Sequence, residues 1–532
     1  MLPLKEKDKV IVGKLLACGC CARCVLRFCC IGVPDAYRQG HRETLRELRA
    51  FVENHNWQKN VAQLEAPCKR SRLELEEATG ESEIEDEGVC VVCLGVLQHL
   101  SDAPQAVQIA DAIKKEKYQV DTLVLSVSLP AQMCVREHSC WLHVKEDVRA
   151  KCGALGRRDV IQVKEAFKWI MQGPLARELG AVAVAAKSPL EVSVCFAHPE
   201  TDADCHFLAS ACPDCFKVSK NKQSAFTRMA VAKALEKIPD NKFLERSPCP
   251  PSRPGSACAP QEVRCVHASV FVAGRYNKFC RSLPQTPWFI NGQRRMESSV
   301  EELVAAPVLA AFGARGFNFS SSGREDVDVR TLGNGKRRQT PPPPPNSSSS
   351  SFTPPGRPFA LELLNPRRSQ LSPESMKNVQ QAINASSQKI RVRDLQMVSR
   401  DATSRLKEGE EEKTKSYRAL VWTQKSIRED DVAFINRIED LKVDQKTPLR
   451  VLHRRTLAVR QRLVRSMSAD LLDEHHFRLG LKTQAGTYIK EFVHGDFGRT
   501  KPNLCQLLDT HTDILELDVE SVDVDWPPAL PD

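Results

Sequence analysis

Two pairs of cysteines place the strongest constraint on how this chain folds. Each pair, Cys21 with Cys24 and Cys90 with Cys93, has two residues between its thiols, so both thiols can bind one ion from a single turn. Two such pairs complete a tetrahedral site with four thiolate ligands and no open position. Because 65 residues separate Cys24 from Cys90, the ion would join two distant segments. We therefore predict a structural zinc site at these four cysteines.

Other cysteines compete for the same role. The chain has 21 cysteines, and four more lie near the first pair: Cys18, Cys20, Cys29 and Cys30. A third pair, Cys212 and Cys215, has the same spacing. The alternative interpretation is that all of these are ordinary buried thiols. In a long chain with clustered cysteines and no evident export signal, reduced thiols with a metal site are favoured over disulfides.

Changes in composition divide the 532 residues into regions. We expect a zinc-binding module, a region of alternating helices and strands, a proline-rich linker and a larger domain, at residues 1–93, 94–247, 248–261 and 262–532. Within the first module, residues 69–88 are acidic and lack apolar periodicity, which predicts a disordered loop. Residues 336–356 interrupt the larger domain with five consecutive prolines and five consecutive serines. Such a run cannot pack a core and favours polyproline II or disorder.

Hydrophobic periodicity predicts helices and strands in both halves of the chain. Helical spacing is present near residues 45–52, 160–170 and 226–230. Strand-like runs occur at residues 123–127, 191–196, 263–272, 359–363, 417–422, 477–481 and 514–524. This mixture predicts an α/β or α+β first half and a second half that is rich in β-sheet.

A charged stretch in the second half, residues 323–333, has five charged side chains within seven residues and a glycine at each end. Val327 and Val329 alternate with the charges, which predicts that part of the stretch is a short strand leaving a turn; on a strand, Asp326 and Asp328 would share a face. A carboxylate at such a place can point into a cleft, where a neighbouring arginine orients it or binds a phosphate. The alternative is a solvated turn with local ion pairs.

A second stretch, residues 484–500, combines a glycine turn with an expected helix and many charges of both signs. Residues 323–333 joined to 356–359, together with 484–500, closely resemble the archaeal and eukaryotic tRNA pseudouridine synthase family, whose N-terminal half contains a THUMP domain. Both cysteine pairs, the block at Cys212–Cys215 and residues 283–288 match as well, so the likeness covers nearly the whole chain. The resemblance implies an α+β fold: a mixed, mainly antiparallel catalytic sheet flanked by helices, and an N-terminal α/β accessory domain that contains the zinc site and, over residues 94–247, a THUMP-like RNA-binding region.

The resemblance also implies an activity and its residues. The chain is expected to be an isomerase that converts uridine to pseudouridine at positions 54 and 55 of the tRNA TΨC arm, with Asp326 as the catalytic carboxylate. Tyr417 would lie against the target base, Ile489 would pack in the pocket, and Lys490 would pair with the aspartate. The arginines expected to hold flanking phosphates are Arg324, Arg330, Arg357 and Arg499. Zinc is carried over to the same four cysteines, and no organic cofactor is expected.

A second interpretation comes from another functional class. The net charge of +10 and the zinc module also suit a non-catalytic RNA-binding protein, and the family resemblance implies microRNA precursors and their processing machinery as its partners. Asp328 is the rival of Asp326 for the catalytic role. We expect a monomer without a membrane segment, located in nucleus and cytoplasm, with mitochondria as a further compartment to test. Whether the insertion at 336–356 leaves the Asp326 loop intact is a question for the structure.

Overall fold

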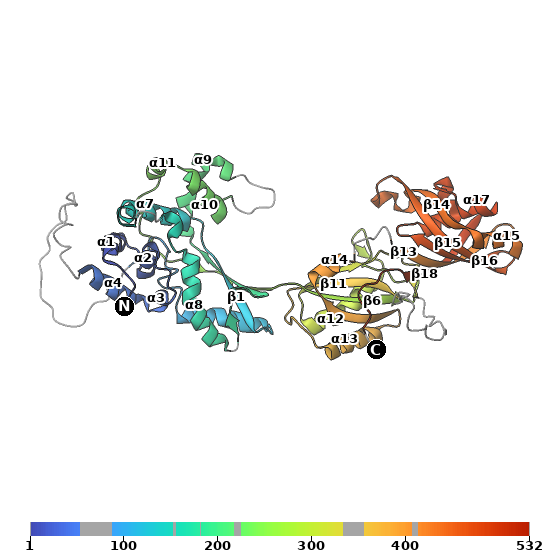
Figure 1. Ribbon diagram of the computed structural model, residues 1–532, viewed down its shortest axis with the longest axis horizontal. Helices are drawn as coiled ribbons and strands as arrows, with labels where there is room; N and C mark the ends of the chain where they lie inside the picture. Colours follow the sequence, from blue (N-terminus) through green and yellow to red (C-terminus); the bar gives the residue numbers. More distant parts are fainter. Residues whose placement is uncertain are drawn as a thin grey trace, which may run out of the picture. The chain divides into compact units, whose positions relative to one another are not determined.

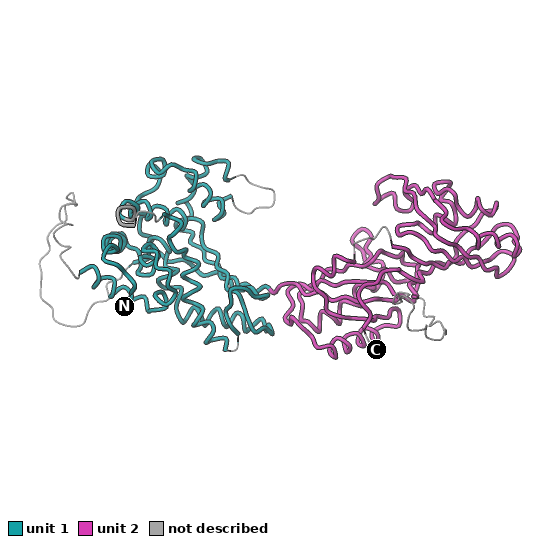
Figure 2. The backbone as a smooth tube through the Cα atoms, in the orientation of Figure 1, with its two compact units in different colours: residues 1–266 teal, residues 267–532 magenta. Residues whose placement is uncertain are grey.

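The computed structural model describes residues 2–53, 88–152, 156–180, 182–216, 225–333, 356–406 and 413–530 (Figure 1). The chain forms two compact units, Met1–Val266 and His267–Asp532, which we call unit 1 and unit 2 (Figure 2). The predicted acidic loop and the proline-serine insertion lie outside the described residues, apart from their last residues, Gly88 and Gly356. No helix among the described residues combines the length and apolar character needed to cross a membrane.

Unit 1 begins with short helices that carry the first cysteine pair. They are η1 (Glu6–Asp8), α1 (Lys9–Ala17), α2 (Ala22–Phe28), α3 (Asp35–Arg38) and α4 (His41–Glu53). In α4, Leu45 and Leu48 are buried, and Phe51 and Val52 pack against the same core. The helix predicted from their spacing is therefore confirmed. All seven residues of α2 are buried, and so is Cys21 directly before it, which places the first cysteine pair inside the unit.

A small sheet with surrounding helices forms the rest of unit 1. Its strands are β1 (Thr122–Ser128), β2 (Ala183–Val184), β3 (Leu190–Ala197), β4 (Ala259–Pro260) and β5 (Arg264–His267). Strand β1 pairs in parallel with β2 and β3, whereas β3 and β4 are antiparallel. The helices are α6 (Ala103–Glu116), α7 (Met133–Cys152), η2 (Arg157–Asp159), α8 (Val163–Leu179), η3 (Pro199–Cys205), α9 (Phe207–Ala211), η4 (Pro213–Cys215), α10 (Arg228–Lys237) and α11 (Asp240–Leu244). The predicted α/β character of this half is confirmed.

The proline-rich segment expected to be a linker at residues 248–261 instead packs within unit 1. Its backbone carbonyls accept hydrogen bonds from buried side chains: the Ser139 hydroxyl donates to Pro248 O at 2.5 Å, and Arg136 donates to Ser252 O at 2.9 Å. Cys258 is itself buried. Composition suggested that the segment had little to bury, but its backbone is held by hydrogen bonds and Cys258 joins the core of unit 1.

Unit 2 is built on one sheet of eleven strands. In chain order the strands are β6 (Val270–Lys278), β9 (Gly316–Ser321), β10 (Arg330–Thr331), β11 (Arg357–Leu364), β12 (Ile390–Val398), β13 (Thr414–Thr423), β14 (Glu439–Lys446), β15 (Val459–Asp473), β16 (His476–Gln484), β17 (Thr500–Lys501) and β18 (Thr512–Val522). The spatial order is β17-β14-β15-β16-β13-β18-β10-β6-β11-β9, and β12 also pairs with β6. Among the described pairs only β10 and β18 run parallel. The predicted mixed, mainly antiparallel sheet is confirmed.

Helices and a small hairpin complete unit 2. They are β7 (Phe289–Ile290), β8 (Gln293–Arg294), α12 (Val300–Phe312), α13 (Pro373–Ser386), α14 (Arg400–Ser404), α15 (Glu429–Ala433), η5 (Phe434–Arg437), η6 (Leu449–Arg454), α16 (Ile489–His494), η7 (Gly495–Gly498) and α17 (Leu504–Leu508). Side chains alternate along β11, so Phe359 and Leu361 pack with α12 and α13 while Ala360 joins the core of the C-terminal strands. Two cores therefore support the single sheet.

Strand β10 connects the two halves of this sheet. Thr331 pairs with Lys278 of β6 on one side and with Val519 of β18 on the other. The short strand expected in part of residues 323–333 is β10, which begins only at Arg330, after the chain turns at Asp326 and Asp328. The carboxylates therefore lie in a loop directly before the central strand.

We predict that Phe477→Ala will destabilise unit 2 strongly. Phe477 is fully buried in the core of β13–β18, and removing such a ring costs about 3 to 5 kcal/mol in transfer energy and cavity formation. Phe497→Ala is the matched control, because that ring is 94% exposed, and its effect should stay within about 0.5 kcal/mol. Denaturant unfolding measures both variants. Equal effects would contradict the proposed core.

Candidate active site

A cavity of about 490 Å³ opens within unit 2 beside β10. It is bounded by the loop before β10, by β13 and β18, by the turn into α16, and by η6. Two carboxylates, Glu325 and Asp326, face eight basic residues on its wall. The basic residues are Arg324, Arg357, Lys415, Arg450, Arg454, Arg455, Arg462 and Lys490. A site with this excess of positive charge favours an anionic ligand.

A buried lysine, Lys278, holds the backbone of the loop that carries the carboxylates. Lys278 is fully buried, and its ammonium donates hydrogen bonds to the carbonyl oxygens of Leu283, Asp326 and Val327 at 2.8, 3.1 and 3.0 Å. Burial lowers the pKa of this lysine, partly offset by the Glu325 carboxylate. Because an ammonium offers three donors, one side chain can satisfy the turn's carbonyl groups.

Glu325 is the inward-facing member of the loop. Its side chain is fully buried and forms an ion pair with Arg357 at 2.8 Å. The Tyr276 hydroxyl donates to both carboxylate oxygens at 2.8 and 2.9 Å. Burial alone would lower the pKa of Arg357, but the Glu325 carboxylate raises it above its ordinary value. These contacts give Glu325 a structural role.

A glycine begins this loop in a backbone conformation that other residues rarely adopt. Gly323 has φ +84°, a left-handed conformation that L side chains rarely adopt. A Cβ atom there would lie 3.0 Å from Arg357 Nη1 and closer still to Lys415 Nζ. The glycine thus lets the backbone approach two cations at the cavity wall.

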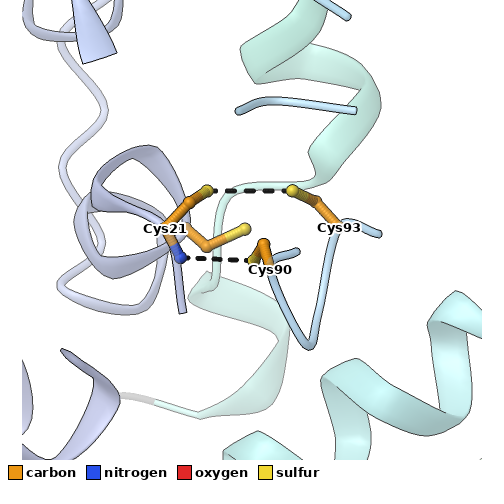
Figure 3. A group of neighbouring side chains, drawn as sticks. Cys21, Cys90 and Cys93 are labelled. Carbon is orange, nitrogen blue, oxygen red and sulfur yellow. Dashed lines mark hydrogen bonds between the residues drawn. The ribbon is translucent and has the colours of Figure 1, made fainter. Parts of the chain in front are cut away.

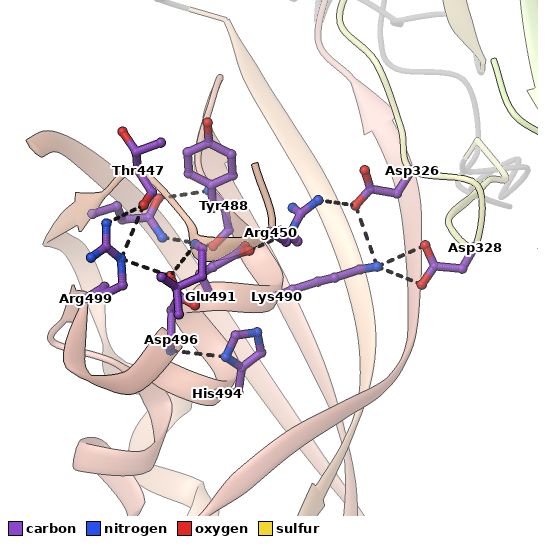
Figure 4. A network of polar contacts seen from close by, with 12 residues as sticks. Asp326, Asp328, Thr447, Arg450, Tyr488, Lys490, Glu491, His494, Asp496 and Arg499 are labelled. Carbon is purple, nitrogen blue, oxygen red and sulfur yellow. Dashed lines mark hydrogen bonds and ion pairs between the residues drawn. The ribbon is translucent and has the colours of Figure 1, made fainter. Parts of the chain in front are cut away.

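Asp326 projects toward two cations (Figure 4). Its Oδ2 accepts a hydrogen bond from Arg450 Nη1 at 2.9 Å and lies 3.6 Å from Lys490 Nζ. Lys490 is also bonded to both oxygens of Asp328, at 2.9 and 2.7 Å. Burial raises the pKa of Asp328, but Lys490 outweighs it and lowers that pKa below its ordinary value. The structure brings Asp326 and Lys490 together as the resemblance implied, with Asp328 as a third member.

The turn before α16 positions Lys490. The Gln445 side chain bonds the Tyr488 backbone on both sides, donating to its carbonyl and accepting from its N–H, each at 2.9 Å. Gly486 in this turn has φ +79°. Ile489, buried at 4% exposure, lines the cavity as the first residue of the predicted helix. These contacts aim the Lys490 side chain toward the Asp326 loop (Figure 4).

Tyr417 forms part of the opposite wall, on β13. Its ring is half-buried, and burial raises the pKa of its hydroxyl while Arg357 works against that shift. Strand pairing fixes its position, with Leu481 of β16 on one side and Val519 of β18 on the other. An aromatic ring on a rigid central strand can stack on a planar ligand.

The predicted phosphate-binding arginines divide into two groups. Arg324 is exposed and lines the cavity. Arg330 is bound by both oxygens of Asp518, at 2.8 and 2.6 Å, and Arg499 donates to Thr447 O at 2.6 Å. Arg357 lines the cavity but is buried against Glu325. Only Arg324 of these four therefore combines exposure with a place on the cavity wall.

Sequence reasoning missed Arg450, which bridges two acidic side chains. Its Nη1 binds Asp326 and its Nε binds the buried Glu491 at 2.6 Å. The signal in the sequence was a run of arginines after a proline: Arg450, Arg454, Arg455, Arg460, Arg462 and Arg465. Such a run also suits a solvated strand, so its charge alone did not identify a site.

The four predicted zinc ligands meet in unit 1. Cys21, Cys24, Cys90 and Cys93 are all buried, and their sulfur atoms lie within 4.8 Å of one another. The sulfurs of Cys21 and Cys93 are 3.7 Å apart, and the Cys21 N–H donates to Cys90 Sγ at 3.2 Å (Figure 3). The competing pair is elsewhere: Cys212 donates to the Ala234 carbonyl in a separate core with α10. The two CxxC pairs therefore form one buried cluster.

We predict that Glu325→Gln will destabilise unit 2 by about 3 kcal/mol or more, because it leaves the Arg357 charge buried without a partner. Asp440→Asn makes the same chemical change in a pair whose two side chains are 63% and 52% exposed, so its cost should be below about 1 kcal/mol. Thermal and denaturant unfolding measure the difference. Similar values for both variants would refute the structural role of Glu325.

Comparison with known proteins identifies relatives along the whole chain. The family model described as eukaryotic Pus10, N-terminal, matches residues 90–265, and that described as Pus10, C-terminal, matches 271–338 and 353–523. The tRNA pseudouridine synthases Pus10 of Mus musculus and Homo sapiens are 53% and 52% identical, each over 100% of both chains. That of Thermofilum pendens is 36% identical over 48% of this chain and 53% of its own. A solved Cbf5-Nop10-Gar1 complex matches 47% of this chain and 48% of its own, at 16% identity and a TM-score of 0.25.

Proposed function

The chain belongs to the Pus10 family of tRNA pseudouridine synthases, and we propose that it isomerises uridine to pseudouridine in tRNA with Asp326 as the catalytic carboxylate. One observation carries the choice of residue: of the loop's three acidic side chains, Asp326 is the one that both lines the cavity and retains exposure. Glu325 is fully buried, and Asp328 is not part of the cavity wall. The three carboxylates are chemically similar, and their different surroundings single out Asp326 as the candidate.

The reaction needs a carboxylate but no redox step. Pseudouridine forms when the bond between ribose C1′ and uracil N1 breaks and C1′ is rejoined to C5 of the same uracil, with the C5 proton finally moved to N1. A carboxylate starts this sequence either as a nucleophile on the base or ribose, or by removing a ribose proton. Both described cations contact Oδ2 of Asp326, so Oδ1 is the oxygen for the substrate. Atoms and electrons balance without any co-reactant.

The remaining wall suits a single extruded nucleotide. Reaching C1′ requires the uridine to leave its stack and enter the cavity. Tyr417 offers a ring face for the uracil, and Ile489 gives an apolar contact. Arg324, Arg454 and Arg455 hold the flanking phosphates at the rim. We place the target at the adjacent uridines 54 and 55 of the TΨC arm, as expected from the family resemblance, with Arg450 released from Asp326 or shared with the substrate when it binds.

Asp326→Ala should abolish pseudouridine formation on tRNA transcripts, with a rate at least about 10²- to 10⁴-fold lower, while RNA affinity stays within a few-fold. Asp328→Ala is the matched control, since it removes the same charge two residues away and should keep measurable conversion. Site-resolved pseudouridine mapping and a binding titration give both readouts. Activity retained by Asp326→Ala, or lost only in Asp328→Ala, would reverse the assignment.

The same pair of readouts tests the second function. A non-catalytic role in binding microRNA precursors requires the basic surface but not the carboxylate. Asp326→Ala should therefore leave binding to a hairpin precursor unchanged, whereas loss of binding in Arg454→Ala/Arg455→Ala would assign that role to the same cavity rim. The observation that favours this RNA-binding function is the set of basic residues on the cavity wall.

The four-cysteine cluster of unit 1 binds a structural zinc ion in this proposal. A tetrahedron with zinc–sulfur bonds of about 2.3 Å has sulfurs about 3.8 Å apart, close to the 3.7 Å between Cys21 and Cys93. Four thiolates leave no open position, so the ion stabilises the unit and takes no part in the reaction. The Leu97 N–H donates to Cys93 Sγ at 3.4 Å, which supports a thiolate there.

Cys24→Ser should lower the melting temperature of unit 1 by about 10 °C or more, because a structural zinc site contributes folding energy directly. Cys212→Ser, which removes a thiol outside the cluster, should leave the melting temperature nearly unchanged. Strong chelation of the wild-type chain should reproduce the Cys24→Ser result. A melting curve insensitive to both chelator and Cys24→Ser would remove zinc from the proposal.

A further inference from the structure

Three more cysteines lie beside the four-cysteine cluster and are not used by it. Cys18, Cys20 and Cys140 have sulfur atoms within 4.8 Å of one another, and those of Cys18 and Cys20 are 3.7 Å apart. Cys20 and Cys140 are buried, and Cys18 is half-buried. Cys18 and Cys20 lie in the short connection between α1 and α2, whereas Cys140 comes from α7. Three thiols from two distant segments thus converge at one point.

The connection is shaped so that consecutive cysteines face different groups. Gly19 has φ +90°, and a Cβ atom there would lie 2.8 Å from the Arg253 guanidinium. The Cys20 N–H is bound by the Leu15 carbonyl at 3.0 Å, and the Gly19 carbonyl accepts from the Val91 N–H at 3.2 Å. The left-handed turn therefore sends Cys20 to one side, while Cys21, next in the chain, serves the four-cysteine cluster.

Cys90 belongs to the four-cysteine cluster and contacts one member of the other group, Cys20. It is one of the four cluster cysteines, and its thiol also lies within hydrogen-bonding reach of the Cys20 thiol. Cys90 is fully buried, and its sulfur accepts the Cys21 N–H. A sulfur placed between two groups of thiols has the position of a bridging ligand. The two groups together are one assembly of seven sulfurs.

The number of thiols matches two metal ions. Two tetrahedral ions need eight thiolate positions, and seven thiolates supply eight when one of them bridges. We propose that unit 1 holds a second zinc ion, bound by Cys18, Cys20 and Cys140 and joined to the first through the Cys90 thiolate. This inference rests on the zinc site proposed above and adds an ion to it. Soft thiolates in a tetrahedral set favour zinc among divalent ions.

The charges around the assembly suit it. Seven thiolates with two divalent ions carry a net charge of −3, which burial makes unfavourable unless cations lie nearby. Arg27 is fully buried, and its Nη1 donates to Cys24 Sγ at 3.5 Å. The guanidinium of Arg253 lies against Gly19, between Cys18 and Cys20 in the chain. Two arginines therefore lie near the cysteines, and one of them, Arg27, is also paired with the Glu137 carboxylate.

Metal content of the purified full-length chain tests this proposal. Wild type should contain two zinc ions per chain by elemental analysis, and Cys18→Ser/Cys20→Ser should contain one. Cys212→Ser/Cys215→Ser, a control that also removes two thiols, should keep two. Circular dichroism and the one retained ion show that the test variant is folded. One ion in wild type, or two in Cys18→Ser/Cys20→Ser, overturns the proposal, and zero in wild type overturns the first zinc site as well.

The bridge has its own test. Chain reconstituted with ¹¹³Cd²⁺ should give two cadmium resonances split by a mutual scalar coupling through the shared sulfur. Cys18→Ser/Cys20→Ser should leave one unsplit resonance. Two resonances without mutual coupling would reject Cys90 as the bridge. A disulfide found by mass spectrometry among Cys18, Cys20 and Cys140 would reject the second ion.

Discussion

The buried ion pair between Glu325 and Arg357 is the interaction on which the proposed active site depends. Neither side chain is more than 2% exposed, and the carboxylate is also held by the Tyr276 hydroxyl. Removing either partner would leave an uncompensated charge in the core, so the pair resists rearrangement. Asp326 directly follows Glu325 in the chain and shares its fixed backbone, which Lys278 supports from below. The position of Asp326, the proposed catalytic residue, therefore depends on Glu325, whose own carboxylate is buried and fully paired.

Strand β6 holds both ends of the chain segment between Leu332 and Gly356, which contains the proline-serine insertion. Asn277 of β6 donates to the Leu332 carbonyl at 2.8 Å, and Arg275 of β6 donates to the Gly356 carbonyl at 3.2 Å. The family model also leaves a gap here, between 338 and 353. Strand β6 therefore holds the backbone on both flanks of the segment, at Leu332 and at Gly356. The Asp326 loop itself is held by Lys278, through contacts that involve described residues alone.

Local patterns predicted the elements of this chain better than its loops. Strands such as β3, β11 and β13 were predicted because their alternation of side chains is written into consecutive residues. The sequence did not show which part of residues 323–333 is strand and which is turn, because the contact that fixes the turn at Asp326 comes from Lys278, 48 residues away. Arg450 was missed for the same reason, since its partner Asp326 is 124 residues distant. Lys490 was named only through the family resemblance, as periodicity gives no reason to pair it with that loop.

The loop shows how one fold assigns different tasks to three similar carboxylates. Glu325 is fully buried and satisfied by Arg357, so it stabilises the structure. Asp328 is 61% exposed and takes two hydrogen bonds from Lys490, so it orients that lysine. Asp326 lies between these extremes at 36% exposure and meets cations through one oxygen. A carboxylate that is partly exposed and paired through only one oxygen can contact a substrate directly. A fully paired carboxylate would first have to lose its partners.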